Sequence, residues 1–481
     1  MADPVDVMRF SRQMLVPGVG RDGQLALTRS SVLVVGCGGI GSSVILYLAG
    51  AGVPLTLVDH DTVETSNLHR QVAHDARALG ENKAESAARR ARELHDNGLQ
   101  VHTVPEKLTA ANVRSLVAAV HLVVDATDNA EARYLLNDAC VLEGRALLSG
   151  SAVGLEGQLT LYDFRRQPPP DSKEEVSARA SAAPPPPRGP CYRCMYPSPE
   201  AVLSCRSCAD AGVIGPVPGL VGCLQAVEAI KFLLLREAGA PAAAAASKAG
   251  LCSMQGQLMY DAFSGQFHSF VLPPRKADCA VCGDRPRIAC MADSAASLHV
   301  HVPGRACVSG SSSSCVDENA SAAAEPVPEV TAAAYSAVRE AGTPHLLLDV
   351  RSAVQFGVVH LRAPSEVGVG RQQQQQQQLL HMPLALLQGR GEKTGGGSQE
   401  ERSRAAVLQV QKARSLLHQK KEGEGEGEGD GAACVYVLCR RGVDSVVATR
   451  LLRDGGLQAV FNVRGGLRGW SEEVDPQFPV Y

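Results

Sequence analysis

The feature that most constrains the fold is a glycine-rich loop between a buried strand and a helix. Apolar residues 31–35 predict the strand, Gly36-Cys37-Gly38-Gly39-Ile40-Gly41 follows, and residues 39–52 predict the helix. Because glycine has no Cβ atom, a phosphate can approach the backbone and bind N–H groups at the helix N-terminus. Asp59 ends the next strand, where a carboxylate can accept hydrogen bonds from ribose hydroxyls. The loop predicts a nucleotide site, and up to this point NAD fits as well as ATP.

Residues beyond the ribose-binding carboxylate favour ATP. Asp61 and Ser66-Asn67-Leu68-His69-Arg70-Gln71 place an amide and a cation there, Lys83 follows, and Asp125-Ala126-Thr127-Asp128-Asn129 ends a later strand. Redox chemistry on NAD needs neither cations around the phosphates nor a carboxylate for Mg²⁺, whereas attack on an α-phosphate needs both. The residues therefore predict nucleotidyl transfer from Mg-ATP, and an NAD-dependent oxidoreductase is the alternative.

The length and patterning predict two domains. A chain of 481 residues is too long for one core. Strands alternate with helices over residues 9–272, as in an α/β domain with a largely parallel sheet. We place this domain at residues 1–290, a Ser/Ala/Pro-rich linker at 291–328, and a smaller α/β domain at 329–481.

Several segments lie outside the regular pattern. Residues 168–190 and 240–249 are predicted to be surface loops or insertions, and the glutamine run 372–378 and the Gly/Glu run 423–429 to be disordered loops. Residues 220–235 form an apolar segment that carries two charges, which predicts a buried helix of a soluble cytosolic protein rather than a membrane span. The net charge of −3 argues against broad binding to nucleic acid or to an anionic membrane.

Fifteen cysteines in such a protein indicate metal ligands or reactive thiols rather than disulfides. Three C-x-x-C pairs occur, namely Cys191/Cys194, Cys205/Cys208 and Cys279/Cys282. Two pairs complete a tetrahedral thiolate site for Zn²⁺. The glycine after the last pair suits a metal knuckle, and the middle pair lacks one, although zinc on the middle pair stays an alternative.

A further cysteine, Cys439, lies between a predicted strand, residues 434–438, and a helix, residues 444–454. At this junction backbone N–H groups and two neighbouring arginines would stabilise an anion on sulfur. A phosphatase-like Cys-x5-Arg loop is an alternative, but the arginine position is Ser445. Cys307 and Cys315 lie close together in the linker, where a regulatory disulfide is a further hypothesis.

The motifs of the first domain resemble the ThiF/MoeB and ubiquitin-activating superfamily, from residues 9–13 through the glycine loop to Thr127-Asp128-Asn129. The resemblance implies a Rossmann-like adenylation domain in a homodimer, with Arg12 reaching ATP across the interface and Asp128 holding Mg²⁺. It implies zinc on Cys191, Cys194, Cys279 and Cys282, and a catalytic Cys208. The nucleotide residues that it implies are Gly36, Gly38, Gly39, Gly41, Asp59, Asp61, Ser66, Asn67, Leu68, His69, Arg70, Lys83, Asp128 and Asn129, of which Arg70 and Lys83 are also catalytic.

The second domain resembles rhodanese-like sulfurtransferases. Matching segments are residues 348–351, 381–384 and 463–470, together with the loop that begins at Cys439. The resemblance implies that Cys439 carries a persulfide. Asp444-Ser445 stands where thiosulfate-using rhodaneses generally have arginine, so a protein persulfide of the cysteine-desulfurase type is the expected donor.

The fusion of the two domains resembles the eukaryotic adenylyltransferases and sulfurtransferases that serve molybdopterin synthase and tRNA thiolation. The resemblance implies that a ubiquitin-like protein is adenylated at its C-terminal glycine and receives sulfur from Cys439 as a thiocarboxylate. Cys208 would then cleave an acyl disulfide, or form a thioester beforehand. A non-catalytic scaffold that binds ubiquitin-like proteins is the second alternative.

Overall fold

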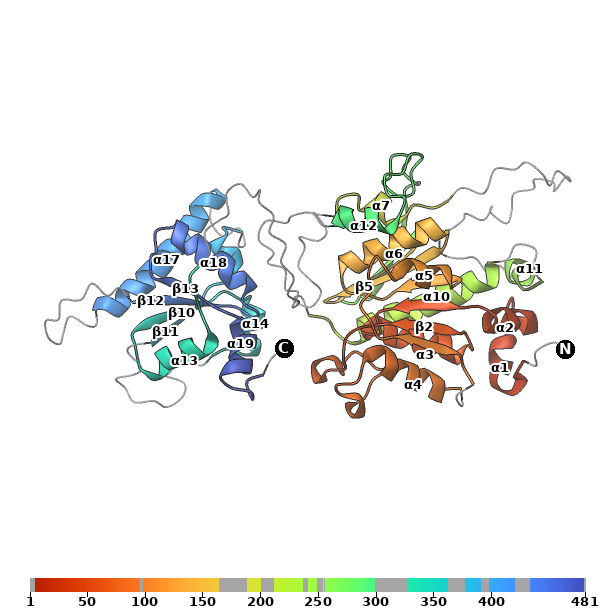
Figure 1. The fold of residues 1–481 in the computed structure, drawn as a ribbon, viewed down its shortest axis with the longest axis horizontal. Coiled ribbons are helices and arrows are strands. Elements are labelled where there is room, and N and C mark those ends of the chain that lie inside the picture. The colour runs from red at the N-terminus through yellow and green to blue at the C-terminus, as the bar shows by residue number, and fades with distance from the viewer. Residues whose placement is uncertain are drawn as a thin grey trace. The chain divides into compact units, whose positions relative to one another are not determined.

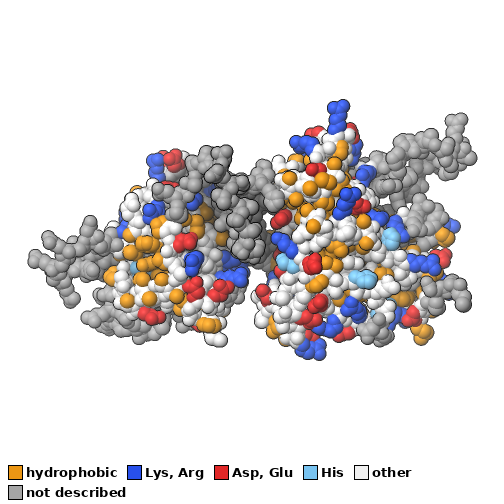
Figure 2. Space-filling model, viewed as in Figure 1, with side chains coloured by type: hydrophobic (Ala, Val, Ile, Leu, Met, Phe, Trp, Pro, Cys, Tyr) orange, Lys and Arg blue, Asp and Glu red, His pale blue; other side chains and the backbone are white. Residues whose placement is uncertain are grey.

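The computed structural model describes residues 5–95, 98–163, 188–199, 212–236, 241–248, 254, 256–298, 327–361, 377–390, 398–419 and 433–479. The chain divides into two compact units, Met1–Ser309 and Gly310–Tyr481, each an α/β fold (Figure 1). On the face drawn in Figure 2, acidic and basic side chains are interspersed over both units.

The first unit is built on an eight-stranded sheet in the order β3-β2-β1-β4-β5-β6-β7-β8. Strands β3 to β5 are parallel, and β6 to β8 are antiparallel. The strands are β1 Val32–Val35, β2 Leu55–Val58, β3 Val101–Val104, β4 Leu122–Asp125, β5 Ala146–Val153, β6 Glu156–Tyr162, β7 Gly256–Asp261 and β8 Gln266–Val271. Val35 is in register with Val58 and Asp125, so β1, β2 and β4 end at one edge, where the loops with the predicted nucleotide residues meet.

Helices cover both faces of this sheet (Figure 1). One layer contains α1 Val7–Met14, α2 Gly20–Thr28, α3 Gly39–Gly50, α4 Lys83–Glu93, α10 Pro216–Leu235 and α11 Pro241–Lys248. The other contains α5 Val113–Ala118, α6 Ala130–Glu143, α7 Tyr192–Met195 and α12 Met291–Leu298. Alternate strand residues face the two layers: Val32 and Val34 belong to one core cluster, and Leu33 and Val35 to the other. The largely parallel α/β fold is confirmed.

Helix α10 is the one helix of the described part of the chain that is long and apolar enough to cross a membrane. Half of its apolar window is buried, and the helix packs on α3 and on strands β5 and β6. It is therefore a core helix, as the sequence predicts.

Two segments differ from the sequence-based expectation. Residues 241–248, expected within a surface insertion, form α11, whose Ala246 is fully buried against the core. Alanine has the highest helix propensity, and its small side chain fits a close helix contact. Residues 291–298, assigned to the linker, form α12, which packs on α6.

The second unit has a parallel five-stranded sheet in the order β11-β10-β12-β13-β9. Its strands are β9 Glu329–Val330, β10 His345–Asp349, β11 Gln377–His381, β12 Cys434–Leu438 and β13 Val460–Val463. Its helices are α13 Ala332–Glu340, α14 Ala353–Val358, α16 Leu384–Leu387, α17 Gln399–Gln419, α18 Val443–Asp454 and α19 Gly466–Glu473. Helices α16 to α18 cover one face of the sheet, and α13 and α19 cover the other (Figure 1).

The glutamine run is only partly a loop. Its last two residues, Gln377 and Gln378, begin strand β11 and pair with β10, so the prediction of a disordered loop is wrong for them. Strand pairing uses backbone groups, so a polar sequence can form an edge strand when apolar residues follow it. The rest of this run, the Gly/Glu run and residues 168–187 lie outside the described residues.

Candidate functional site

The glycine loop packs tightly against the turn that follows β4. Gly36 has φ of +92°, and a Cβ atom there would lie 2.6 Å from the carbonyl oxygen of Ala126. A Cβ atom on Gly41 would overlap the carbonyl of Gly36. Glycine is therefore required at both positions, and the N-terminus of α3 is left open toward the cleft.

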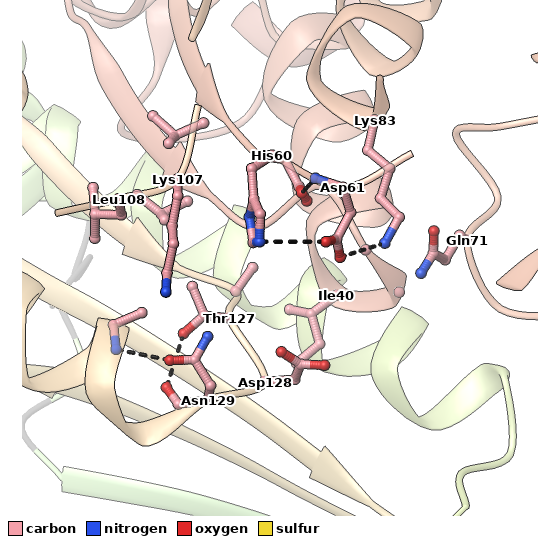
Figure 3. Close-up of a pocket in the computed structure, with 18 of the residues that line it drawn as sticks. Ile40, His60, Asp61, Gln71, Lys83, Lys107, Leu108, Thr127, Asp128 and Asn129 are labelled. Carbon is pink, nitrogen blue, oxygen red and sulfur yellow. Dashed lines mark hydrogen bonds and ion pairs between the residues drawn. The ribbon is translucent and has the colours of Figure 1, made fainter. Parts of the chain in front are cut away.

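The loop forms one wall of a cleft at the edge where β1, β2 and β4 end (Figure 3). Nine of the predicted nucleotide residues line it: Gly36, Gly38, Gly39, Asp59, Asp61, Arg70, Lys83, Asp128 and Asn129. The others, Gly41, Ser66, Asn67, Leu68 and His69, are not among the lining residues. Asn67 and Ser66 instead accept hydrogen bonds from Arg70, which does line the cleft.

Asp59 is oriented by two backbone amides. Its Oδ2 accepts a hydrogen bond from the Cys37 N–H at 2.7 Å, and its Oδ1 accepts one from the Asp61 N–H at 2.9 Å. Burial raises the pKa of Asp59, and these two hydrogen bonds oppose the shift. Each carboxylate oxygen has a second lone pair, so Asp59 can still accept from ribose hydroxyls.

Lys83 is the first residue of α4, and Asn82 caps this helix by accepting from the N–H groups of Ala84 and Glu85. Its ammonium donates to Asp61 Oδ2 at 2.9 Å. The Lys83 side chain is only 8% exposed, whereas that of Asp61 is 55% exposed. The ion pair therefore holds a cation in the wall of the cleft, as Figure 3 shows.

Arg70 is fixed by the segment before it. Its guanidinium donates to Asn67 Oδ1 at 2.9 Å and to the Ser66 carbonyl at 3.0 Å. Burial lowers the pKa of Arg70, and the nearby Asp128 opposes this shift. Because these contacts use neutral acceptors, the positive charge stays available to a phosphate.

Asp128 lies at the cleft, next to Asn129, the N-cap of α6 (Figure 3). Its carboxylate makes no hydrogen bond or ion pair with any described residue. An exposed carboxylate at a cleft that also holds two cations is the donor type that Mg²⁺ binds.

A network around Asp125 positions this turn, and the sequence analysis assigned it no role. Asp125 is fully buried, and its carboxylate accepts from Arg133 Nε at 2.7 Å, Ser149 Oγ at 2.6 Å and Thr127 Oγ1 at 2.6 Å. Burial is the largest influence on the pKa of Arg133 and lowers it, but the charge and hydrogen bond of Asp125, together with Tyr192 and Tyr162, outweigh burial and raise that pKa. The sequence did contain one signal for this network. Asp125 ends an otherwise apolar strand, and a carboxylate that is buried there needs a partner.

Gln71 is a second residue to which the sequence assigned no separate role. It is buried in the cleft wall, and its Oε1 has no hydrogen-bond partner among the described residues. A buried polar atom without a partner is costly, so the cleft fits a polar ligand such as a nucleotide.

Four predicted zinc ligands come together in a buried cluster. The Sγ atoms of Cys191, Cys194, Cys279 and Cys282 all lie within 4.8 Å of one another. The distances are 3.8 Å for Cys191–Cys194, 3.6 Å for Cys191–Cys279 and 3.4 Å for Cys194–Cys282. Tetrahedral zinc with Zn–S bonds of about 2.3 Å requires sulfurs roughly 3.8 Å apart. The cluster therefore fits Zn²⁺.

The electrostatics of the cluster also favour a cation. Hydrogen bonds from neighbouring thiols, that of Cys191 first, lower the pKa of Cys194 to about 6, and they lower that of Cys279 as well. The pKa of Cys191 is raised, because it donates to these thiolates. All four sulfurs can ionise together only if a positive ion neutralises them.

The knuckle of the first pair is clamped to helix α6. Arg193 donates from Nε and Nη2 to Asp138 at 2.8 Å and 2.7 Å, with both side chains buried. The Tyr192 N–H donates to Asn137 Oδ1 at 2.7 Å. From α12, Ser294 Oγ donates to Asp138 at 2.6 Å. Helix α6 therefore begins two residues after Asp128, and its side contacts the Cys191–Cys194 knuckle.

In the second unit, Cys439 lies directly after β12 and is buried. Its Sγ accepts hydrogen bonds from the Gly442 N–H at 3.1 Å and from Ser445 Oγ at 3.2 Å. These donors stabilise negative charge on sulfur. A backbone N–H is expected at this junction, the Ser445 hydroxyl is not, and a contribution of the two neighbouring arginines stays a prediction.

Three glycines allow this loop to form. Gly442, Gly465 and Gly466 have φ of +86°, +74° and +59°, and a Cβ atom on Gly466 would overlap the Cys439 carbonyl. The Leu467 N–H donates to that carbonyl at 2.9 Å. The segment 463–470 therefore supports the active loop directly.

Not every predicted residue falls in a site. Arg12 is exposed on α1 and does not line the cleft of its own chain. Cys208, Cys205, Cys307 and Cys315 lie outside the described residues, so their roles stay predictions.

A glycine loop, a carboxylate at the end of the next strand, two cations and an exposed carboxylate around one cleft define the class: a Rossmann-like domain of the nucleotide-binding type. It carries a four-cysteine cluster that fits zinc, and a rhodanese-like unit follows it in the chain. A family model described as the ThiF family matches residues 10–281. "Adenylyltransferase and sulfurtransferase MOCS3" of Aedes aegypti is 34% identical over 99% of this chain and 89% of the relative. The Dictyostelium discoideum protein of the same name is 32% identical over 99% and 97%.

Among solved structures, E. coli MccB with MccA-N7isoASN aligns at 20% identity and a TM-score of 0.43, over 58% of this chain and 76% of that one. The chain belongs to the ThiF family, in its MOCS3 group of adenylyltransferases and sulfurtransferases.

Proposed function

We propose that this chain adenylates the C-terminal glycine of a ubiquitin-like sulfur carrier and converts it to a thiocarboxylate with sulfur from Cys439. The observation that carries the proposal is the presence of two reactive sites in one chain: a cleft with phosphate cations and a free carboxylate, and a cysteine sulfur held by hydrogen-bond donors. Full-length similarity to adenylyltransferases and sulfurtransferases supports it.

In the first unit, the acceptor carboxylate attacks the α-phosphate of ATP, which gives an acyl adenylate and pyrophosphate. Arg70 and Lys83 would stabilise charge on the transferring phosphate and the leaving group, and Asp59 would orient the ribose. Asp128 would hold Mg²⁺, which neutralises phosphate charge when bound. Adenylation is needed because carboxylate oxygen is a poor leaving group.

In the second unit, the Cys439 persulfide displaces AMP and forms an acyl disulfide. Cleavage of that disulfide by a second thiol, for which Cys208 is our candidate, releases the thiocarboxylate and leaves a disulfide between the two cysteines. The proposed donor is a protein persulfide, the proposed acceptors are the molybdopterin synthase small subunit and the tRNA-thiolation modifier, and the proposed assembly is a cytosolic homodimer in which Arg12 completes the partner's cleft.

The test uses ATP–pyrophosphate exchange and acceptor mass spectrometry with each purified ubiquitin-like acceptor. We expect Asp128→Asn to lower exchange by about a hundredfold or more. We expect Cys439→Ser to abolish the replacement of one oxygen by sulfur at the terminal glycine while exchange continues.

A matched control is Asp261→Asn, which changes a half-buried carboxylate outside the cleft and should leave both readouts unchanged. If no acceptor stimulates exchange, the scaffold hypothesis replaces the proposal. If Cys439→Ser still forms thiocarboxylate, Cys439 is not the sulfur carrier.

A further inference from the structure

Ser445 contacts the sulfur of Cys439, although neither the active-loop motif nor the strand–helix pattern assigned it a role. Its Oγ lies 3.2 Å from Sγ, nearly as close as the Gly442 N–H at 3.1 Å. These two groups are the hydrogen-bond donors to Cys439 Sγ among the described residues. Of these two donors, the Ser445 hydroxyl belongs to a side chain, so a substitution can remove it.

The position of Ser445 in the fold directs its hydroxyl toward the Cys439 sulfur. Ser445 is the third residue of α18, is fully buried, and is six residues after Cys439. Inside a helix a serine hydroxyl can bond to the carbonyl four residues earlier, but Ser445 is in the first turn, next to the loop that precedes the helix. Here the loop folds back over the helix start, and the hydroxyl meets sulfur instead. Burial leaves water no access to replace the bond.

Sulfur transfer creates the charge that such a donor stabilises. The Cys439 thiolate attacks the outer sulfur of a donor persulfide, so that an Sγ–S bond forms and the donor S–S bond breaks. The electron pair leaves with the donor thiolate, and no net oxidation occurs. Negative charge is on Sγ before the attack, when Cys439 is the nucleophile. A hydrogen bond to an ionised sulfur is stronger than one to a neutral thiol.

We propose that Ser445 is a catalytic residue of the sulfur-transfer site, whose hydroxyl stabilises the Cys439 thiolate. The inference rests on the proposed function for the identity of Cys439 as sulfur carrier. It extends that function, because it assigns stabilisation of the thiolate to Ser445, which follows the loop Cys439–Asp444.

Other charged groups lie around the same loop. Arg440, Arg441 and Asp444 belong to it, Arg464 and Arg468 belong to the segment packed against it, and the buried pair Asp349–Arg351 ends the neighbouring strand β10. All of them stay in place when only the hydroxyl is removed. A difference between wild type and variant therefore reports the hydroxyl alone.

The test measures alkylation of Cys439 by iodoacetamide as a function of pH in the full chain, quantified by mass spectrometry of the peptide that carries Cys439. For Ser445→Ala we expect the midpoint of the profile to rise by about one pH unit, and the rate at pH 7 to fall about tenfold. Persulfide formation from glutathione persulfide should fall similarly at pH 7 and recover at higher pH. A merely structural role would not produce that recovery.

The matched control is Thr449→Val. Thr449 is also fully buried on α18, but its hydroxyl donates to the Ser445 carbonyl at 2.8 Å and not to sulfur. We expect its alkylation profile to match wild type. Trp470 fluorescence, which reports the second unit, verifies folding of both variants.

Superimposable profiles for Ser445→Ala and wild type would overturn the inference, as would an equal shift in Thr449→Val. Because alkylation requires only the thiolate, this result is independent of whether Cys439→Ser loses thiocarboxylate formation. Failure of the inference and failure of the proposed function are therefore distinguishable.

Discussion

The buried ion pair between Arg193 and Asp138 allows a quantitative test of how the Cys191–Cys194 knuckle, the proposed zinc-binding segment, is held. The side chains are 3% and 0% exposed, and Arg193 also lies over the Tyr134 ring at 4.8 Å. Arg193→Leu removes the cation and leaves a buried carboxylate with only the neutral donors Ser294 and Asn137. Removing one partner of a buried pair costs about 3–5 kcal/mol. We expect the first unit to lose stability by that amount.

Two further variants separate charge from packing. In Arg193→Leu/Asp138→Leu no charge is left behind, so we expect at least about half of the lost stability to return. The control is Arg404→Leu, which removes the exposed partner of Glu400, with side chains 75% and 77% exposed. Exposed pairs contribute about 0–1 kcal/mol, so the control should lie near wild type.

The assay is urea unfolding followed by zinc release and far-UV circular dichroism. The chain has a single tryptophan, Trp470, which lies in the second unit, so its fluorescence serves as an internal reference that Arg193→Leu should not shift. If zinc release in Arg193→Leu begins at the same urea concentration as in Arg404→Leu, the pair does not hold the knuckle and the reasoning fails.

Three more predictions concern stability and metal content. Burial lowers the pKa of His345 below its ordinary value of about 6.5, so the unfolded chain binds the proton more tightly. The second unit should therefore lose stability as pH falls below about 6.5, and His345→Gln should flatten that dependence when Trp470 fluorescence is followed. Cys194→Ser should lose stoichiometric zinc by elemental analysis, whereas Cys290→Ser, a cysteine outside the cluster, should retain it. Gly466→Ala should lower the melting temperature of the second unit by calorimetry, because its Cβ would overlap the active-loop carbonyl, and an unchanged value would contradict the geometry.

The sequence predicted the parts of the fold that follow local rules. The apolar run 434–438 predicts β12 to the residue, and the glycine loop predicts the first residue of α3, because both signals lie in adjacent residues. The four cysteines that meet in the cluster were also predictable in part: tetrahedral metal geometry favours paired ligands, which left three candidate pairs, and the family resemblance indicated these two.

The buried networks that position the site depend on residues that are distant along the chain. The partners of Asp125 come from α6 and β5, and Asp138 meets Arg193 55 residues later, so neither network leaves a local pattern. Predictions that rest on amino-acid composition are wrong at two places. An alanine-rich segment became the packed helix α11, and the end of a glutamine run became part of β11, because tertiary contacts can override a low-complexity composition.

Helix α12 determines where the first unit can be cut. A shortened chain that stops at residue 290 would keep all four cysteines of the buried cluster and every predicted nucleotide residue, yet it would lack Ser294 and the buried Met291. The Asp138 carboxylate would lose a donor, and apolar surface of α6 would be uncovered. Expression of the adenylating half alone should therefore extend at least to residue 298, and poor solubility of a shorter version would reflect the missing helix rather than an intrinsic need for the second half.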